Sequence, residues 1–301
     1  MTPNEAFRLD SFNKRELEER RFAHNGWSIF YNGGRASEDC FTHIVSLDNT
    51  LTIEVAYPGY FALTFADLAR FDISSQDKVI RVFPFSRDVT EETIRHLLND
   101  QVLPRIFASE GALVLHAGSV LTPEGAVILV GPSGRGKSTL TASLHVQGYP
   151  LLGDDAILVS ATAAGMECVA TYRSLRLFSD SIASVFPYPV QISAGAHYTS
   201  KLNVSNLGSD NHLGSPVAVR AIFILGEPVE RDIVVRRMEP SEACMGLMEQ
   251  SFSLDPSDVR RAQTRLDNAS KVATQVPVFR IDYPRDFSRI ASVHEAIFSA
   301  L

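Results

Sequence analysis

Short runs in which apolar and polar residues alternate fill the first hundred residues of the chain. Alternation with a period of two predicts strands, and these strands are expected at 27–31, 41–47, 51–57, 61–65 and 79–85. Turn-forming residues separate several of the runs, namely Asn-Gly-Gly at 32–34, Asp-Asn at 48–49 and Pro-Gly at 58–59. The pattern therefore predicts a small sheet-rich N-terminal unit built from hairpins.

A helical pattern follows at 88–109. Its apolar residues recur at a helical spacing, and Thr90, followed by Thr93 and nearby acidic residues, is typical of a helix N-terminus. Pro104 is expected to bend this segment or to divide it into two helices. We therefore predict an N-terminal unit with its connecting helix over 1–108 and a second domain over 109–301.

Strand and helix patterns alternate through the second domain. Strands are predicted at 112–121, 126–130, 156–160, 217–225, 233–237 and 278–281. Helices are predicted at 137–147, at 241–250 with Ser241 at its start, and at 288–299. This alternation predicts an α/β fold for the C-terminal two-thirds of the chain.

Composition narrows the setting in which the protein works. The 301 residues are 45% hydrophobic and 21% charged, with a net charge of −7, as in an ordinary soluble globular protein. The negative charge argues against a general affinity for nucleic acid or for a membrane surface. No run approaches the length of a membrane span, and the charged N-terminus does not resemble a signal peptide. Because Cys40, Cys168 and Cys244 are scattered, a reduced cytoplasmic protein is expected.

Residues 131–138 carry the motif with the clearest chemistry. Their sequence, Gly-Pro-Ser-Gly-Arg-Gly-Lys-Ser, fits the Walker A pattern G-x-x-x-x-G-K-[ST], between a predicted strand and a predicted helix. Glycines let the backbone curl so that its N–H groups point at an anion, and the helix adds the positive end of its dipole. The nucleotide-binding residues are expected to be Gly131, Pro132, Ser133, Gly134, Arg135, Gly136, Lys137, Ser138 and Thr139.

Two of these side chains have separate expected roles. Lys137 supplies a mobile cation for the β- and γ-phosphates, and the Ser138 hydroxyl can ligate Mg²⁺. The motif therefore predicts a protein that binds a nucleoside triphosphate together with Mg²⁺.

His116 is expected to lie close to this loop. If 112–121 pairs with 126–130 across the turn at 122–125, the register brings His116 near Gly131. A histidine there could contact phosphate or adjust the proton balance. It could equally be a histidine whose ring is satisfied by the backbone at a strand end, and the sequence leaves both interpretations open.

Two adjacent carboxylates, Asp154 and Asp155, follow the predicted helix. Such a pair is costly unless a cation or a proton lies between the two groups. One aspartate could hold Mg²⁺ while the other accepts the proton of an incoming hydroxyl. The alternative is a loop in which either aspartate merely turns the chain.

The segment 115–159 resembles the catalytic core of HPr kinase/phosphorylase and its shorter relatives. That family joins a histidine-bearing strand, a turn, a Walker A loop and helix, and an aspartate pair. The resemblance implies a core fold shared with phosphoenolpyruvate carboxykinases, with ATP and Mg²⁺ as cofactors. It also implies that Asp155 is the catalytic base, that Lys137 and Ser138 handle phosphates and metal, and that His116 belongs to the active site. With Asp155 as the base, Asp154 is the aspartate expected to hold the metal together with Ser138.

Beyond this core the resemblance weakens. The block at 172–180 looks like the R-L-x-L block of HPr kinase-related proteins, and it makes Arg176 a candidate phosphate contact. The metal-binding glutamate of the HPr kinases is missing, because Thr171 and Tyr172 stand at its place; whether Asp180 substitutes stays open. Lys201 and Arg220 are weaker candidates, and the N-terminal unit does not resemble that of the HPr kinases.

Among the shorter relatives, the sequence looks most like the lasso-peptide tailoring kinases. One point of resemblance is the segment near the C-terminus, Ile281-Asp-Tyr-Pro-Arg-Asp286. The expected activity is transfer of the γ-phosphoryl group of ATP to a Ser or Thr hydroxyl of a peptide or protein. A small-metabolite kinase and an ATP-binding sensor or scaffold remain alternatives. Homo-oligomerisation also stays open.

Overall fold

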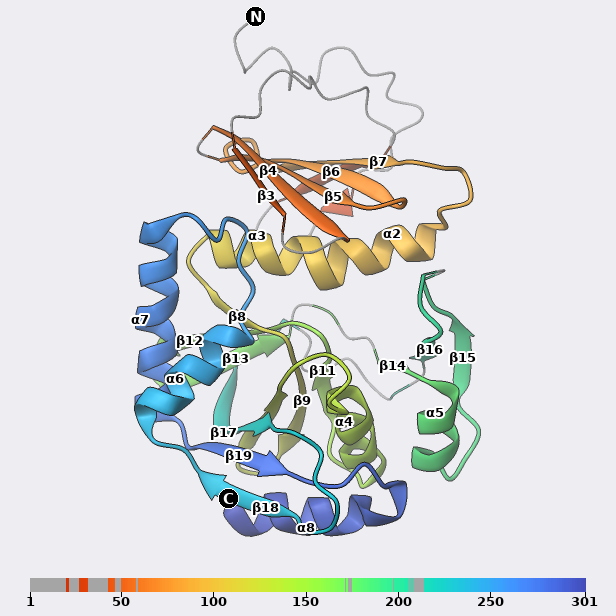
Figure 1. Ribbon diagram of the computed structural model, residues 1–301, viewed down its shortest axis with the longest axis vertical. Coiled ribbons are helices and arrows are strands. Elements are labelled where there is room, and N and C mark those ends of the chain that lie inside the picture. Colours follow the sequence, from red (N-terminus) through yellow and green to blue (C-terminus); the bar gives the residue numbers. More distant parts are fainter. Residues whose placement is uncertain are drawn as a thin grey trace, which may run out of the picture. The chain divides into compact units, whose positions relative to one another are not determined.

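The computed structural model in Figure 1 describes residues 20–21, 27–31, 43–46, 50–57, 59–170, 172, 175–196, 198–205, 207 and 214–301. The turns expected at 32–34 and 48–49, together with Cys40, Pro58 and Thr171, lie outside these ranges. The chain forms two compact units. The first is Met1–Leu98 with Leu254–Ser257, and the second is Asn99–Ser253 with Asp258–Leu301.

The first unit is built on a seven-stranded sheet with the order β1-β2-β7-β6-β5-β4-β3. Consecutive strands from β3 to β7 pair antiparallel, so this part of the sheet is a series of hairpins, as the alternating pattern predicts. Its strands are β1 (Arg20–Arg21), β2 (Ser28–Tyr31), β3 (His43–Ser46), β4 (Leu51–Tyr57), β5 (Tyr60–Phe65), β6 (Ala69–Ser74) and β7 (Val79–Pro84). The pattern missed β6, which a tight turn at Asp67 (φ 60°) joins to β5.

The helical segment expected at 88–109 consists of three pieces. These are α2 (Glu91–Leu97), a π-helical turn η3 (Leu98–Val102) and α3 (Leu103–Ser109). The Thr90 hydroxyl accepts a hydrogen bond from the Thr93 N–H and caps α2, as expected. Pro104 lies in the first turn of α3, where its missing N–H is tolerated, so the helical path is divided just before it.

The two units divide between Leu98 and Asn99, ten residues before the boundary expected after position 108. The difference arises at α3, which contacts strand β8 of the second unit and buries Ile106 and Phe107. A helical period reports that a segment is helical, but it does not report which sheet the helix covers.

The second unit is organised around a mixed nine-stranded sheet. Strand β10 pairs parallel with β17 on one side and antiparallel with β9 on the other, and β17 also pairs parallel with β19. The strands are β8 (Leu113–Leu115), β9 (Ala117–Thr122), β10 (Gly125–Val130), β11 (Leu151–Gly153), β12 (Ile157–Thr162), β13 (Gly165–Ala170), β17 (Val217–Leu225), β18 (Val234–Arg237) and β19 (Val278–Asp282).

Helices cover both faces of the central strands. Along β10, Ile128 and its alternate neighbours pack against α6 and α7, whereas Val127 and Leu129 pack against α4 and α8. These helices, seen in Figure 1, are α4 (Lys137–Val146), α6 (Pro240–Glu249), α7 (Val259–Gln275) and α8 (Ile290–Ala300). Because both faces of β10 are buried, its sequence is a continuous run of apolar residues.

A small three-stranded sheet completes this unit. It has the order β14-β16-β15, and helix α5 directly follows β14 in the chain. The elements are β14 (Arg176–Leu177), α5 (Ser179–Val185), β15 (Gln191–Ala194) and β16 (Leu202–Ser205). No element had been predicted between 161 and 216.

In the described part of the chain, no helix combines the length and apolar character that a membrane span requires.

Three sequence-based expectations for the second unit need correction. The strand expected at 112–121 breaks at His116, because β8 pairs with β12 while β9 pairs with β10 and β11. Helix α6 begins at Pro240 with Glu239 at its cap, so Ser241 is not the capping residue. Helix α7 was not predicted, although Asp258 caps it and Ala269, Val272 and Ala273 form its buried stripe.

A buried histidine on helix α8 contacts helix α4. The His294 side chain on α8 is 2.8 Å from the Ser143 hydroxyl of α4, measured from Nε2 to Oγ. Because that hydroxyl donates to the Leu140 carbonyl, Nε2 must be the donor to Ser143. Nδ1 then remains an acceptor without a partner among the described residues. Burial lowers the pKa of His294 from 6.5 to about 4.

This lowered pKa predicts how stability depends on pH. Between pH about 6.5 and about 4 the unfolded chain takes up a proton at His294 that the folded protein does not, so stability falls as pH falls. His294→Gln keeps an N–H donor for Ser143 and removes the titration. As pH falls through this window, the free energy of unfolding of the variant should decrease by about 2 kcal/mol less than that of wild type, as measured by urea unfolding. Between pH 7 and 8 the two proteins should respond alike; a parallel loss in both proteins down to pH 4 would contradict the assignment.

Candidate functional site

One cavity of about 450 Å³ collects most of the predicted site residues. It is lined by His116, Asp155, Arg176 and every residue from Ser133 to Thr139. Gly131, Pro132 and Asp154 do not line it, and neither does Arg220, which instead pairs with Glu124. Lys201 and Asp180, two candidates of uncertain role, also line the cavity.

The glycine-rich loop at 131–138 joins β10 to α4. Its three glycines have φ values of 152°, 78° and 91°, in the region that residues with a Cβ rarely adopt. The Lys137 ammonium donates to the Gly131 carbonyl at 2.6 Å and to the Pro132 carbonyl at 3.2 Å, across the inside of the loop. The backbone therefore curls around Lys137, and the free N–H groups at the start of α4 face the cavity end of the loop.

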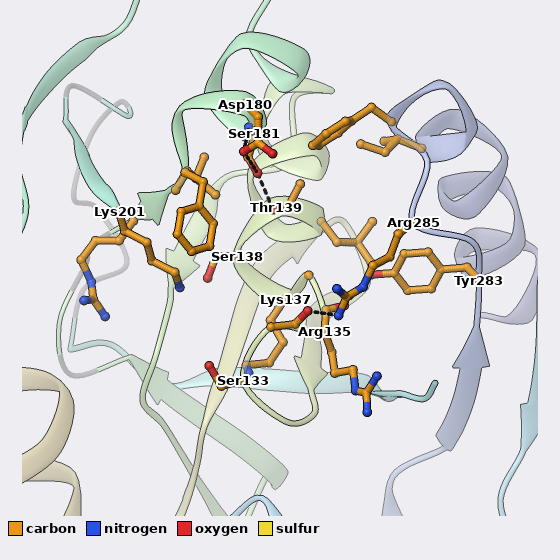
Figure 2. Close-up of a pocket in the computed structure, with 18 of the residues that line it drawn as sticks. Ser133, Arg135, Lys137, Ser138, Thr139, Asp180, Ser181, Lys201, Tyr283 and Arg285 are labelled. Atoms are coloured by element: carbon orange, nitrogen blue, oxygen red, sulfur yellow. Dashed lines mark hydrogen bonds between the residues drawn. The ribbon is translucent and has the colours of Figure 1, made fainter. Parts of the chain in front are cut away.

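A second segment of the chain fixes the outside of this loop. Tyr283, which follows β19, donates its hydroxyl to the Arg135 carbonyl at 3.0 Å, and Arg285 donates to the Gly134 carbonyl. Figure 2 shows both side chains beside the loop. A Cβ placed on Gly136 would lie 2.8 Å from the Tyr283 oxygen, so this glycine is required by close approach as well as by its φ.

Asp154 is buried directly behind the loop. Neither of its carboxylate oxygens has a hydrogen-bond partner among the described residues, although the Ser138 hydroxyl lies near enough to favour the charged form. Burial, together with the charge of Asp155, raises the pKa of Asp154 to about 7. An unpartnered buried carboxylate beside a hydroxyl is an unfavourable arrangement that a cation would relieve.

Asp155 faces the cavity and is held by two cationic or hydrogen-bonding side chains. Its Oδ2 accepts from Arg176 Nη2 at 2.6 Å, and its Oδ1 is 3.5 Å from His116 Nε2. Burial alone would raise the pKa of Asp155, but His116 and Arg176 hold it well below its usual range. The backbone of Asp155 is left-handed, with φ 74°, which is strain that persists only where the surroundings enforce it.

Arg176 connects Asp155 to a carboxylate that sequence reasoning missed. Its Nη2 lies 2.9 Å from Oδ2 of Asp100, and the side chains of all three residues are largely buried. Asp100 sits in the π-helical turn η3, and π-turns inside helices often mark functional sites. A single aspartate in an apolar helical pattern was the only local signal, and it does not identify a partner 76 positions away.

Lys137 is the cationic side chain of the loop itself. Burial lowers its pKa, and the carboxylates of Asp154 and Asp155 oppose that effect. Lys201 approaches from the other side of the cavity, as Figure 2 shows, and its Nζ lies 5.6 Å from the centroid of the Phe178 ring. Two lysines and an arginine thus surround the carboxylate pair, a charge arrangement suited to an anion that carries a cation with it.

These residues fit Mg²⁺ in the presence of a polyphosphate. The described ranges contain no group of three or more His, Cys, Asp or Glu residues that could hold a metal by themselves. Mg²⁺ commonly takes only one or two protein ligands and completes its shell with water and phosphate oxygens. Ser138 and the unpartnered Asp154 carboxylate meet that requirement.

Comparison with known proteins adds little to this picture. No protein-family model matches the chain, and no curated protein matches it in sequence. Among solved structures, the Hpr(Ser) kinase/phosphatase from Coxiella burnetii aligns with 62% of this chain and 97% of its own, at 13% identity and a TM-score of 0.31. A likeness this weak carries no argument about activity, so the case for function depends on the residues of the cavity.

The buried bridge of Arg176 yields a stability prediction. Arg176→Met removes the guanidinium that bridges the buried carboxylates of Asp100 and Asp155, and we expect the free energy of unfolding to fall by about 3–5 kcal/mol. Adding Asp100→Asn removes one of the two negative charges and should restore part of the loss. Urea unfolding of the single and double variants measures both effects.

Arg95→Met is the matched control, because Arg95 pairs with Glu91 and Glu92 at the surface of α2. It should lower the free energy of unfolding by less than about 1 kcal/mol. Equal losses in the Arg176 and Arg95 variants would show that the buried bridge stabilises the fold no more than the surface pairs do.

Proposed function

We propose that this protein is an ATP- and Mg²⁺-dependent kinase that transfers the γ-phosphoryl group to a hydroxyl, most specifically a Ser or Thr hydroxyl of a peptide or protein. One observation carries the proposal. The glycine-rich loop and the carboxylate of Asp155 line the same cavity, so a phosphate bound at the loop lies within reach of a group that can accept a proton.

The loop supplies the phosphate-binding half of the site. Its left-handed glycines and the start of α4 direct N–H groups toward an anion, and Lys137 adds a positive charge inside the curl. Tyr283 and Arg285 hold the outer carbonyls of the loop, so the N–H groups are oriented before the ligand arrives. Such preorganisation is the main way in which a protein accelerates phosphoryl transfer.

Ser138 and Asp154 would hold Mg²⁺, whose contribution when bound is to neutralise charge on the β- and γ-phosphate oxygens. The support is the fit described above: a buried carboxylate with no hydrogen-bond partner in the described chain, next to the loop hydroxyl. With Asp154 committed to this role, Asp155 is the carboxylate that faces the acceptor.

Asp155 accepts the acceptor's proton. As the hydroxyl oxygen bonds to the γ-phosphorus, the bond to the β-phosphate oxygen breaks and the proton passes to the Asp155 carboxylate. A low pKa makes Asp155 a weak base, but in a loose transition state the hydroxyl loses its proton late, when it is already acidic. Arg176 and His116 keep the carboxylate in one orientation for this step.

A peptide acceptor is supported by the small sheet beside the cavity. Strand β14 carries Arg176, and β15 is an edge strand of this sheet among the described residues, with all four of its side chains exposed. An edge strand offers backbone N–H and C=O groups that an extended peptide can pair with. A small-metabolite kinase has no need of such a surface.

The activity is tested with ATP labelled at the γ-phosphate and the peptides encoded beside the gene. Wild type should place the label on a Ser or Thr hydroxyl. Asp155→Asn should still bind ATP but transfer roughly 100- to 10,000-fold more slowly, as expected when a general base is lost. Lys137→Ala should lose both binding and transfer.

Asp267→Asn is the matched control, because Asp267 is an exposed carboxylate on α7 and lies outside the cavity. It should transfer phosphate at the wild-type rate. ATP binding without label on any peptide would overturn the peptide acceptor, and unchanged transfer by Asp155→Asn would overturn the assignment of the base.

A further inference from the structure

The cavity continues beyond the residues used so far. Its lining includes an apolar group, Phe287, Ile290 and Val293, which comes from the short helix η4 (Phe287–Arg289) and from α8. Val293 is buried in the same apolar cluster as Leu140 of α4, so the wall belongs to the core. A kinase needs no such apolar wall for its phosphates, which implies that another part of a ligand lies there.

Phe287 is the exposed member of this wall. Its side chain is 41% exposed although it lines a cavity, whereas most other large apolar side chains of this unit are buried. An aromatic face left open inside a cavity is suited to stacking on a planar ring. Phe178, the other exposed phenylalanine of the cavity, already lies under the Lys201 ammonium.

The position of the loop decides which part of a nucleotide reaches Phe287. The γ-phosphate must face Asp155, so the nucleoside extends in the opposite direction, past Thr139 at the first turn of α4. Near Thr139 lie polar groups of α5: the Thr139 hydroxyl donates to Ser181 Oγ at 3.3 Å, and Asp180 Oδ1 accepts from the Ser181 N–H at 2.6 Å. Figure 2 shows these three residues together.

One short segment, residues 283–287, both contacts the glycine-rich loop and contributes Phe287 to the cavity wall. Tyr283 and Arg285 bind loop carbonyls, and Asp286 accepts from the Ser288 N–H at 2.9 Å and so caps η4, which begins with Phe287. The distance between the phosphate end and the aromatic end is therefore fixed by the five consecutive residues from Tyr283 to Phe287. This rigidity favours a ligand with a fixed separation between its phosphates and its planar ring.

We propose that this end of the cavity is the nucleoside subsite, in which the base of a bound nucleoside triphosphate stacks on Phe287 while Asp180 accepts a hydrogen bond from the ribose or the base. The inference rests on the proposed nucleotide-dependent function and adds to it the residue that distinguishes a nucleotide from a bare polyphosphate.

The test compares two ligands, ATP and inorganic tripolyphosphate, each titrated with Mg²⁺ by calorimetry. Phe287→Ala should weaken ATP binding roughly 5- to 100-fold, the effect expected for a lost base–aromatic stack, and leave tripolyphosphate binding within twofold of wild type. Phe287→Trp should keep ATP binding. Phe85→Ala, which truncates an aromatic residue that is 52% exposed and outside the cavity, should change neither ligand.

Three results would overturn the subsite. These are equal weakening of both ligands by Phe287→Ala, no weakening of either, and selective weakening of ATP by Phe178→Ala instead. Failure of the proposed function looks different: wild type would then bind neither ligand, or would bind ATP but transfer its γ-phosphoryl group to no acceptor, whatever Phe287→Ala does to ATP binding.

Discussion

The buried charge cluster around Arg176 is the interaction on which the candidate site depends. Arg176 bridges Asp100 and Asp155, and His116 approaches Asp155 from a third direction. Charges that are removed from water are tolerated only when they are paired with good geometry. The π-helical turn, the β11–β12 connection and β14 must therefore meet in one arrangement, and this arrangement points the Asp155 carboxylate into the cavity.

The two adjacent aspartates acquire opposite properties from this cluster. Asp155 contacts both Arg176 and His116 and stays ionised, whereas the Asp154 carboxylate has no hydrogen-bond partner within the described ranges and has a raised pKa. Neighbouring carboxylates whose environments push their pKa values apart are suited to different roles. The proposed division into a metal-holding group and an acceptor-facing group is based on the observation that Asp155 lines the cavity whereas Asp154 does not.

Local patterns predicted much of the second unit. Strands β10 and β17 and helix α4 were expected nearly to the residue, because a fully apolar run, a glycine-rich loop and a helical stripe are each contained in a short stretch of chain. The register that brings His116 to the start of the loop was also predicted correctly: Ala117 pairs with Val130. Helix α7 was missed, and the strand expected at 112–121 turned out to change partners at His116.

The sequence by itself determined the chemistry of the loop, since eight consecutive residues contain its glycines, its lysine and its hydroxyl, and their backbone conformation depends on one another. It also placed the aspartate pair next to that loop in the chain. Only the tertiary structure decided that Asp100 partners Arg176, that Tyr283 and Arg285 bind the loop carbonyls, and that Phe287 lines the cavity. The printed contacts join residues 76 to 151 positions apart. The order of strands in the sheet, which no local pattern encodes, determines which segments meet.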